Sequence, residues 1–243
     1  MMRLALRNLI AEWGIAAMTN PAAAPPLRAL AAFAAAADTS GAAVNLSQDH
    51  VERLLHVENV FERCADGIRL GDDYLANLDG LRWRAAQFVE AVERSPCGPA
   101  PFSWEEYETL PGPNAAEPGE KVLDWTLCAA AVLFNLRLYF EVHEILEPCW
   151  LRARGELKTF LQGLIQVAVG FQHHSNGNLR GAQSLLTSGT DKLLPLRPAA
   201  WGVELQSFCA AVAECIQQVA RQKESAPRSL SELPCFVLHG RPP

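Results

Sequence analysis

The 243-residue sequence lacks several features that identify common classes of protein. It has no cluster of Lys and Arg and a formal net charge of −6, which argues against a nucleic acid partner because phosphate backbones are bound by basic patches. It has no apolar run of the roughly 18–20 residues that span a bilayer, so no transmembrane segment is predicted. It also has no strand pattern and no internal repeat. These absences favour a soluble helical protein.

The seven cysteines include no Cys-x-x-Cys pair, the spacing that is typical of redox motifs and zinc sites. They are scattered at Cys64, Cys97, Cys128, Cys149, Cys209, Cys215 and Cys235. Their odd number and the lack of a secretory signal predict free, mostly buried thiols in a reducing compartment. We therefore expect an intracellular protein, cytoplasmic or, if residues 1–45 are a transit peptide, in the plastid stroma.

Proline and glycine divide the chain into five parts, which are residues 1–45, 46–95, 96–120, 121–224 and 225–243. The first part is Ala-rich and poor in acidic residues, and it is predicted to be a flexible N-terminus, with a targeting sequence as the alternative. The second part has apolar residues at helical spacing on both sides of Gly71, and Ser47 is placed as an N-cap. It therefore predicts a helical hairpin.

The third part holds six prolines and three glycines, a density that no helix survives, and it predicts a linker that Phe102 and Trp104 attach to the fold. The fourth part predicts a bundle of four helices, which are Lys121–Leu151, Glu156–His174, Leu179–Leu194 and Ala199–Lys223. The fifth part is expected to be irregular. The predicted fold class is all-α, an antiparallel helical bundle with an additional N-terminal helical hairpin and no sheet.

The unusual residues of the chain lie in Leu138–Trp150, where most side chains are large and apolar. On a helical wheel of about 100° per residue, His143, Glu144 and Glu147 fall within about 60° of Phe140. The same arc contains Leu133, Leu136, Trp150 and Leu151. If this apolar face meets the core, the three ionisable groups require partners elsewhere in the fold, because unpaired buried charge is very costly.

The next predicted helix carries a matching polar stripe of Thr159, Gln162, Gln166 and His173. Gly163 and Gly170 lie beside the stripe, and since glycine weakens a helix, their presence predicts a close approach by another backbone. A short turn makes this helix antiparallel to the preceding one. We therefore expect Glu147 to hydrogen-bond to Gln162 or Gln166, with His143 or Glu144 in the same pocket.

These residues have several interpretations. One is a buried polar network that specifies the packing, with Arg180 neutralising a carboxylate. Another is a pocket for a small ligand or a partner protein, and a third is a metal-assisted or acid–base hydrolase using His143, Glu144, Glu147 and His173. His-Glu-x-x-Glu is similar to the zinc motif His-Glu-x-x-His, so His143, Glu147 and His173 are candidate ligands of a divalent metal. We favour the small-ligand or protein-binding module and assign no cofactor.

Two motifs of the chain together resemble a known family. The first is Phe140–Glu147 followed by Trp150, and the second is Phe160–Gln166 running on to His173, Gly177–Asn178 and Gly181–Ala182. Over about residues 132–194 they resemble the domain of unknown function family numbered 309. The resemblance implies a compact helical bundle of small bacterial, archaeal and plastid-lineage proteins, without an established activity. The family's acidic and histidine positions correspond to His143, Glu144, Glu147 and His173.

Overall fold

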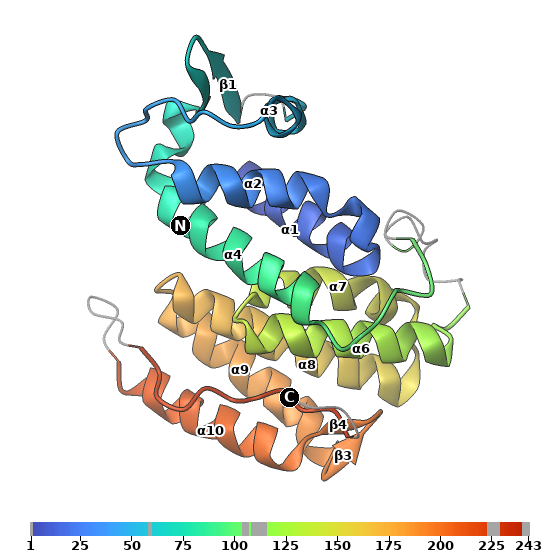
Figure 1. Cartoon of the computed structure of the whole chain (residues 1–243). Helices are drawn as coiled ribbons and strands as arrows, with labels where there is room; N and C mark the ends of the chain where they lie inside the picture. Colours follow the sequence, from blue (N-terminus) through green and yellow to red (C-terminus); the bar gives the residue numbers. More distant parts are fainter. Residues whose placement is uncertain (1, 58–59, 104–106, 108–115, 223–228, 240–243) are drawn as a thin grey trace. The chain divides into compact units, whose positions relative to one another are not determined.

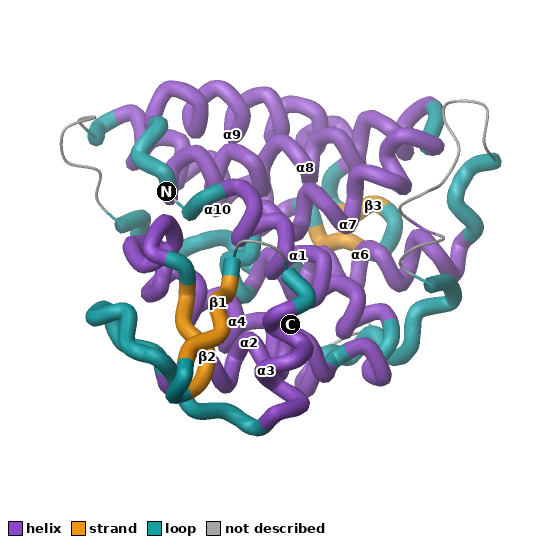
Figure 2. The backbone as a smooth tube through the Cα atoms, turned by 90° about the horizontal axis from the view of Figure 1, so that it is seen from above, coloured by secondary structure: helices purple, strands orange, loops and turns teal. Residues whose placement is uncertain are grey.

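A computed structural model describes residues 2–57, 60–103, 107, 116–222 and 229–239 (Figure 1). Helices make up most of the backbone, and the strands form two small two-stranded sheets (Figure 2). The predicted all-α class is therefore confirmed, whereas the expectation that the chain has no sheet is wrong. The chain divides into two compact units, residues 1–95 and residues 96–243.

The N-terminal unit begins with two helices, α1 (Leu4–Thr19) and α2 (Pro25–Ala36). Both bury apolar residues, so the expectation that residues 1–45 are flexible is wrong. Alanine has the highest helix propensity, and Pro25 and Pro26 stand in the first turn of α2, where a missing N–H is tolerated. These prolines therefore start a helix instead of interrupting one. The targeting role of this stretch stays a prediction.

Shorter elements replace the helical hairpin that we predicted for residues 46–95. Ser47 caps α3 (Gln48–Leu55) as expected, but α3 ends before an antiparallel sheet of β1 (Phe61–Cys64) and β2 (Gly67–Leu70). Each strand contains only four residues. Over so short a length the apolar residues also fit a helical period, so the hydrophobic pattern did not separate the sheet from a helix.

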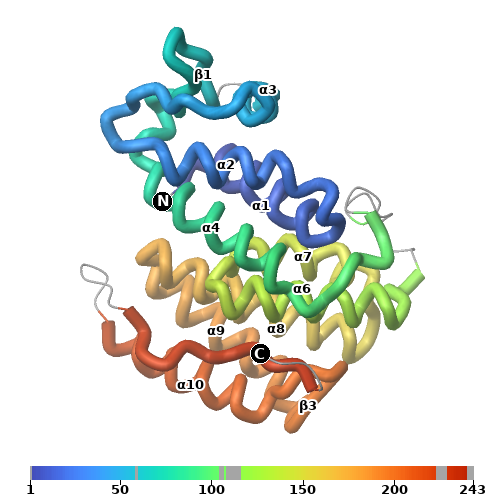
Figure 3. Tube along the Cα trace, viewed as in Figure 1, coloured from blue at the N-terminus to red at the C-terminus, as the bar shows by residue number. Residues whose placement is uncertain are grey.

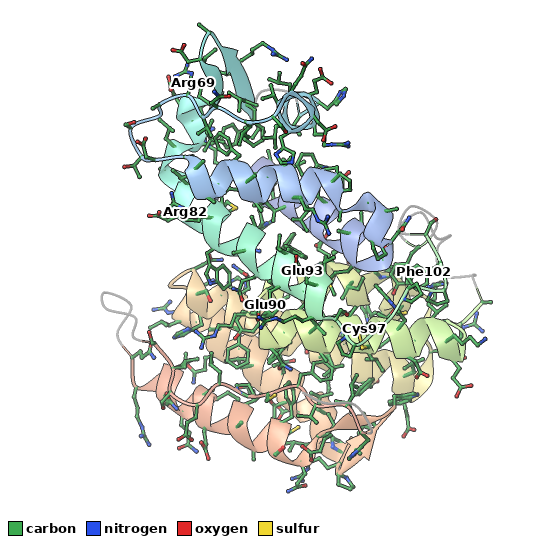
Figure 4. The ribbon with its side chains drawn as sticks, viewed as in Figure 1. Arg69, Arg82, Glu90, Glu93, Cys97 and Phe102 are labelled. Atoms are coloured by element: carbon green, nitrogen blue, oxygen red, sulfur yellow. A yellow bond between two sulfur atoms is a disulfide. The ribbon has the colours of Figure 1, made fainter. Side chains whose placement is uncertain are left out.

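The second helix predicted for this unit begins as the 3-10 helix η2 (Asp72–Asn77) and continues as α4 (Leu78–Arg94). Arg82 of α4, which Figure 4 labels, donates hydrogen bonds to the backbone carbonyls of Ala34 and Ala37. The last carbonyls of a helix have no partner within the helix. The Arg82 side chain therefore satisfies the carboxyl end of α2 and joins α2 to α4.

The C-terminal unit is a helical bundle whose helices follow one another along the chain (Figure 3). They are α6 (Glu120–Asn135), α7 (Tyr139–Arg152), α8 (Gly155–Ser175), α9 (Leu179–Leu193) and α10 (Gln206–Ala220). The bounds of α8 and α9 agree with the predicted helices to within one residue. The prediction of a single helix over Lys121–Leu151 is wrong, because α6 and α7 are separate.

The break between α6 and α7 lies at residues 136–138. Arg137 has a φ of 62°, which a right-handed helix does not contain, and the N–H of Leu138 donates to the carbonyl of Leu133. Neither glycine nor proline marks this position, so the apolar period runs through it in the sequence. A helical wheel continued across the break therefore assigns the faces of α7 incorrectly.

The helix predicted over Ala199–Lys223 also begins later than expected. Its first residues form an antiparallel pair of short strands, β3 (Ala199–Ala200) and β4 (Val203–Glu204). Trp201 and Gly202, which join them, have φ values of 45° and 76°. Two consecutive positive φ angles are typical of the type I′ turn that connects tight hairpins. The turn therefore displaces the first turns of the predicted helix.

An aromatic cluster joins the helices of this unit. The ring of Phe134 on α6 lies 5.2–6.0 Å from four other rings, those of Tyr139, Phe171, Phe208 and Phe236. Phe236 belongs to the described tail residues 229–239, which contain no helix. The Asn135 side chain holds this tail through both the N–H and the carbonyl of Phe236. The tail is thus packed into the core although its backbone is irregular.

Glycines allow α8 and α9 to pack closely. A Cβ on Gly163 would lie 2.8 Å from Leu193, and one on Gly189 would lie 2.8 Å from the carbonyl oxygen of Gly163. A Cβ on Gly170 would likewise lie 2.8 Å from Leu186. Contacts this short are essentially never seen for real Cβ atoms. The predicted close approach beside Gly163 and Gly170 is therefore confirmed, and the approaching helix is α9.

Cys97 and Cys128 form a disulfide, with their Cα atoms 5.6 Å apart. The expectation that all seven cysteines are free thiols is wrong for this pair, which tertiary structure joins across 31 residues of sequence. Cys64, Cys149, Cys209, Cys215 and Cys235 are free. Trp104, which we expected to attach the linker, lies outside the described residues. Of the helices that the structure describes, none has the length and apolarity needed to cross a membrane.

Candidate functional site

His143, Glu144 and Glu147, which we call the His143 cluster, lie together on α7. The imidazole Nδ1 of His143 is 2.9 Å from Glu144 Oε1, and its Nε2 is 3.8 Å from Glu147 Oε1. The spacing explains the second contact, because residues four apart lie on the same face of a helix. One imidazole is therefore flanked by two carboxylates from its own helix.

The His143 cluster is not buried as the helical wheel predicted. The side chains of His143, Glu144 and Glu147 are 30%, 33% and 41% exposed. The core face of α7 is the opposite one, with Tyr139, Glu141, Val142, Ile145, Leu146 and Cys149. The wheel failed because it was extended from Leu133 and Leu136 across the break before α7. The ionisable groups are accordingly accessible from one side.

Glu141 is the acidic residue that sequence reasoning missed. It lies within the family motif and is 0% exposed, whereas Glu144 and Glu147 are not buried. A helical wheel restricted to the observed bounds of α7 places Glu141 beside Val142 and Ile145, and this signal would have found it. A fully buried carboxylate is costly to desolvate, so Glu141 belongs to the interior of the fold and not to the accessible cluster.

The polar stripe of α8 faces α9 instead of the His143 cluster. Ser188 of α9 donates its hydroxyl to Gln166 Oε1 at 3.2 Å. The glycines beside the stripe are also the ones in contact with α9. Within the described part of the chain, no hydrogen bond joins Glu147 to Gln162 or Gln166, so that predicted pairing is wrong. The sequence identified the close face of α8 correctly but assigned it to the wrong neighbour.

His173 lies near the carboxyl end of α8. Its Nδ1 is 2.9 Å from Nδ2 of Asn178, and the Asn178 Oδ1 accepts a hydrogen bond from the N–H of Gly181. Asn178 is therefore the N-cap of α9 and also orients His173. This arrangement gives His173 a structural role at the α8–α9 turn.

We expect Asn178→Ala to lower the free energy of unfolding by about 1 kcal/mol, because a side-chain cap of a helix is lost. Asn178→Asp keeps the capping oxygen but removes the amide donor to His173, so it should cost only a few tenths of a kcal/mol if capping dominates. Urea denaturation followed by circular dichroism measures both changes. Equal losses for the two variants would assign the effect to His173 instead of the cap.

The candidate metal ligands are not assembled. His143 and Glu147 lie on α7, whereas His173 lies near the carboxyl end of α8 and contacts Asn178. The described residues contain no group of three His, Cys, Asp or Glu side chains placed to hold a metal ion. The set of His143, Glu147 and His173 that we proposed from the sequence is therefore wrong as a three-ligand site.

Arg180 is exposed on α9, at one end of an open depression of about 690 Å³. Its lining consists of polar α9 side chains, Arg180, Gln183, Ser184, Thr187, Ser188, Asp191 and Lys192. Lys192 donates to the hydroxyl of Ser188, which in turn contacts Gln166. The role of Arg180 as a charge partner of a carboxylate stays a prediction.

These features define a helical bundle that presents a partly exposed histidine–carboxylate cluster on α7. Residues 127–185, which run from α6 into α9, match the family described as Domain of unknown function (DUF309). The match contains both motifs of the resemblance that we found over about residues 132–194, and that resemblance is confirmed for this segment. Comparisons with curated proteins and with solved structures found no match.

Proposed function

We propose that the helical bundle is a binding module whose His143 cluster holds the cationic group of a small ligand, such as an ammonium. The observation that supports the proposal is the pair of carboxylates flanking one imidazole on an accessible face. A carboxylate only accepts hydrogen bonds, so the contact with Glu144 places a proton on Nδ1 of His143. In the neutral imidazole the Nε2 lone pair then faces Glu147, so two hydrogen-bond acceptors lie side by side. A ligand group that donates hydrogen bonds is therefore favoured there.

An ammonium group fits this arrangement chemically. It carries three N–H donors and no acceptor. Glu144 and Glu147 give the cluster two negative charges when the imidazole is neutral. Hydrogen bonds between charged partners are stronger than those between neutral ones. A small amine can therefore donate hydrogen bonds to both carboxylates. A neutral alcohol of the same length makes weaker hydrogen bonds because it carries no charge.

Calorimetric titration with 1,4-diaminobutane, and with 1,4-butanediol as the neutral analogue, tests the proposal. We expect the diamine to bind the wild type and the diol to bind at least about tenfold more weakly. Glu144→Gln and Glu147→Gln should each weaken diamine binding by about fivefold to tenfold, because one charged acceptor is lost. Glu214→Gln on the exposed face of α10 is the matched control and should leave binding unchanged. Equal binding by all three variants would reject the proposal.

Acid–base chemistry is the second candidate function. The contact between Nδ1 of His143 and Glu144 favours it, because a carboxylate that orients an imidazole leaves Nε2 positioned as a base. Hydrolysis of p-nitrophenyl acetate is a simple measurement of such reactivity. The wild type should exceed His143→Asn in rate by at least about tenfold if this candidate is correct. Equal rates would leave the binding module as the function of the cluster.

A further inference from the structure

Tyr107 is held in an unusually complete polar site, although it comes from the Pro- and Gly-rich part of the chain. Its side chain is 1% exposed. Its hydroxyl oxygen lies 3.1 Å from the Thr126 hydroxyl, 3.0 Å from the Ile145 carbonyl oxygen and 3.0 Å from Cys149 Sγ. These groups come from α6 and α7 and supply both a donor and acceptors for one phenol hydroxyl.

The aromatic ring of Tyr107 is enclosed as well. Phe102 stacks on it with the ring centroids 4.3 Å apart, and the Arg152 guanidinium lies 5.6 Å from its centroid. Burial raises the pKa of Tyr107 and of Cys149, so both groups are neutral near pH 7. The faces of α6 and α7 thus form a site with a hydrogen-bonding floor and aromatic and cationic walls, which suits a neutral phenol.

The segment that carries Tyr107 is fastened to α6 near its start. Cys97 is joined to Cys128 by the disulfide, and the carbonyl oxygen of Gly98 accepts a hydrogen bond from Trp125 Nε1 at 3.0 Å. Phe102 then contacts the ring of Trp125 edge-on. Figure 4 labels Cys97 and Phe102, the covalent and the aromatic attachment of this segment. A covalent attachment at Cys97 keeps Tyr107 at a high effective concentration near its site.

We propose that α6 and α7 form a phenol-binding site, that the chain occupies this site with its own Tyr107, and that the Cys97–Cys128 disulfide keeps it occupied. A dithiol reductant breaks this disulfide. One thiolate attacks the half-buried Cys97 sulfur, Cys128 leaves as a thiolate and takes up a proton, and the second reductant thiol then displaces Cys97 as its own disulfide forms. With the attachment lost, a small phenol competes with Tyr107 for the site.

The accessibility of Cys149 reports whether the site is open, because its sulfur touches the Tyr107 hydroxyl. We would label the full-length protein with iodoacetamide and quantify each cysteine by peptide mass spectrometry. In the double variant Cys97→Ser, Cys128→Ser, Cys149 should be labelled at least tenfold faster than in the oxidised wild type. Cys215, which is buried on α10, is the internal control and should keep its rate.

Two small probes then test the chemistry of the site. Millimolar p-cresol should return the labelling rate of Cys149 in the double variant toward the wild-type rate, whereas toluene, which lacks the hydroxyl, should be about tenfold less effective. In Tyr107→Ala, p-cresol should also raise the melting temperature more than toluene does. Unchanged labelling of Cys149 in the double variant, or equal effects of p-cresol and toluene there, would overturn the proposal even if Tyr107→Ala fails to fold.

Discussion

Replacing Phe134 with alanine is expected to lower the free energy of unfolding by about 3–5 kcal/mol, the range measured when a buried phenylalanine is truncated. Phe134 is 2% exposed, and its ring contacts others from α7, α8, α10 and the C-terminal tail. Since these elements meet on one ring, neighbouring side chains have little freedom to fill the cavity. Edge-to-face ring contacts add to the loss.

Urea denaturation of Phe134→Ala, followed by circular dichroism, measures this change. Phe134→Leu retains most of the apolar volume and should lose less, about 1.5 kcal/mol or below. Leu151→Ala is the surface control, because Leu151 is 50% exposed and should change stability by no more than about 0.5 kcal/mol. A loss below about 1 kcal/mol for Phe134→Ala would show that this ring is not the centre of the core.

Replacing Gly189 with valine is expected to cost about 3 kcal/mol or more, at the upper end for an overpacked core. A Cβ at this position would lie 2.8 Å from the carbonyl oxygen of Gly163 and 2.9 Å from the backbone nitrogen of Val167. Backbone atoms of α8 cannot turn aside as a side chain can. The substitution therefore forces α8 and α9 apart along their whole contact.

Gly189→Ala introduces the same Cβ without the branches and should cost less, about 2 kcal/mol. Thr187→Ala lies two residues away on the exposed face of α9 and should stay within about 0.5 kcal/mol of the wild type. Thermal and urea unfolding of the three variants provide the comparison. If Gly189→Val were as stable as Thr187→Ala, the close packing of α8 and α9 would be wrong.

Local sequence signals predicted the helix ends that are marked by a turn glycine or by a capping side chain. Gly177 lies in the turn between α8 and α9, and the bounds of both helices were predicted to within one residue. Ser47 was likewise recognised as the cap of α3. Gly163 and Gly170 predicted a close helix contact because glycine within a helix requires a packing reason. Each of these features depends on residues near one another in the chain.

The candidate site was only half determined by the sequence. The spacing of His143, Glu144 and Glu147 placed them on one face of a helix, and the structure brings them together as a cluster. The direction of that face depended on where α7 begins. Arg137, which follows α6, has a positive φ, and an arginine at such a position gives no sequence signal as a glycine would. The apolar pattern therefore indicated burial where the structure has exposure.

The sequence by itself determined the helical class, the bounds of α8 and α9 and the grouping of the His143 cluster, because helix period, turn residues and caps act over a few residues. Only the tertiary structure decided that α8 turns its polar stripe toward α9, that Cys97 meets Cys128, and that Tyr107 is buried against Thr126 and Cys149. These contacts join segments far apart in the chain. Their free energy comes from burial and from pairing of polar groups, which depend on the position of every packed neighbour.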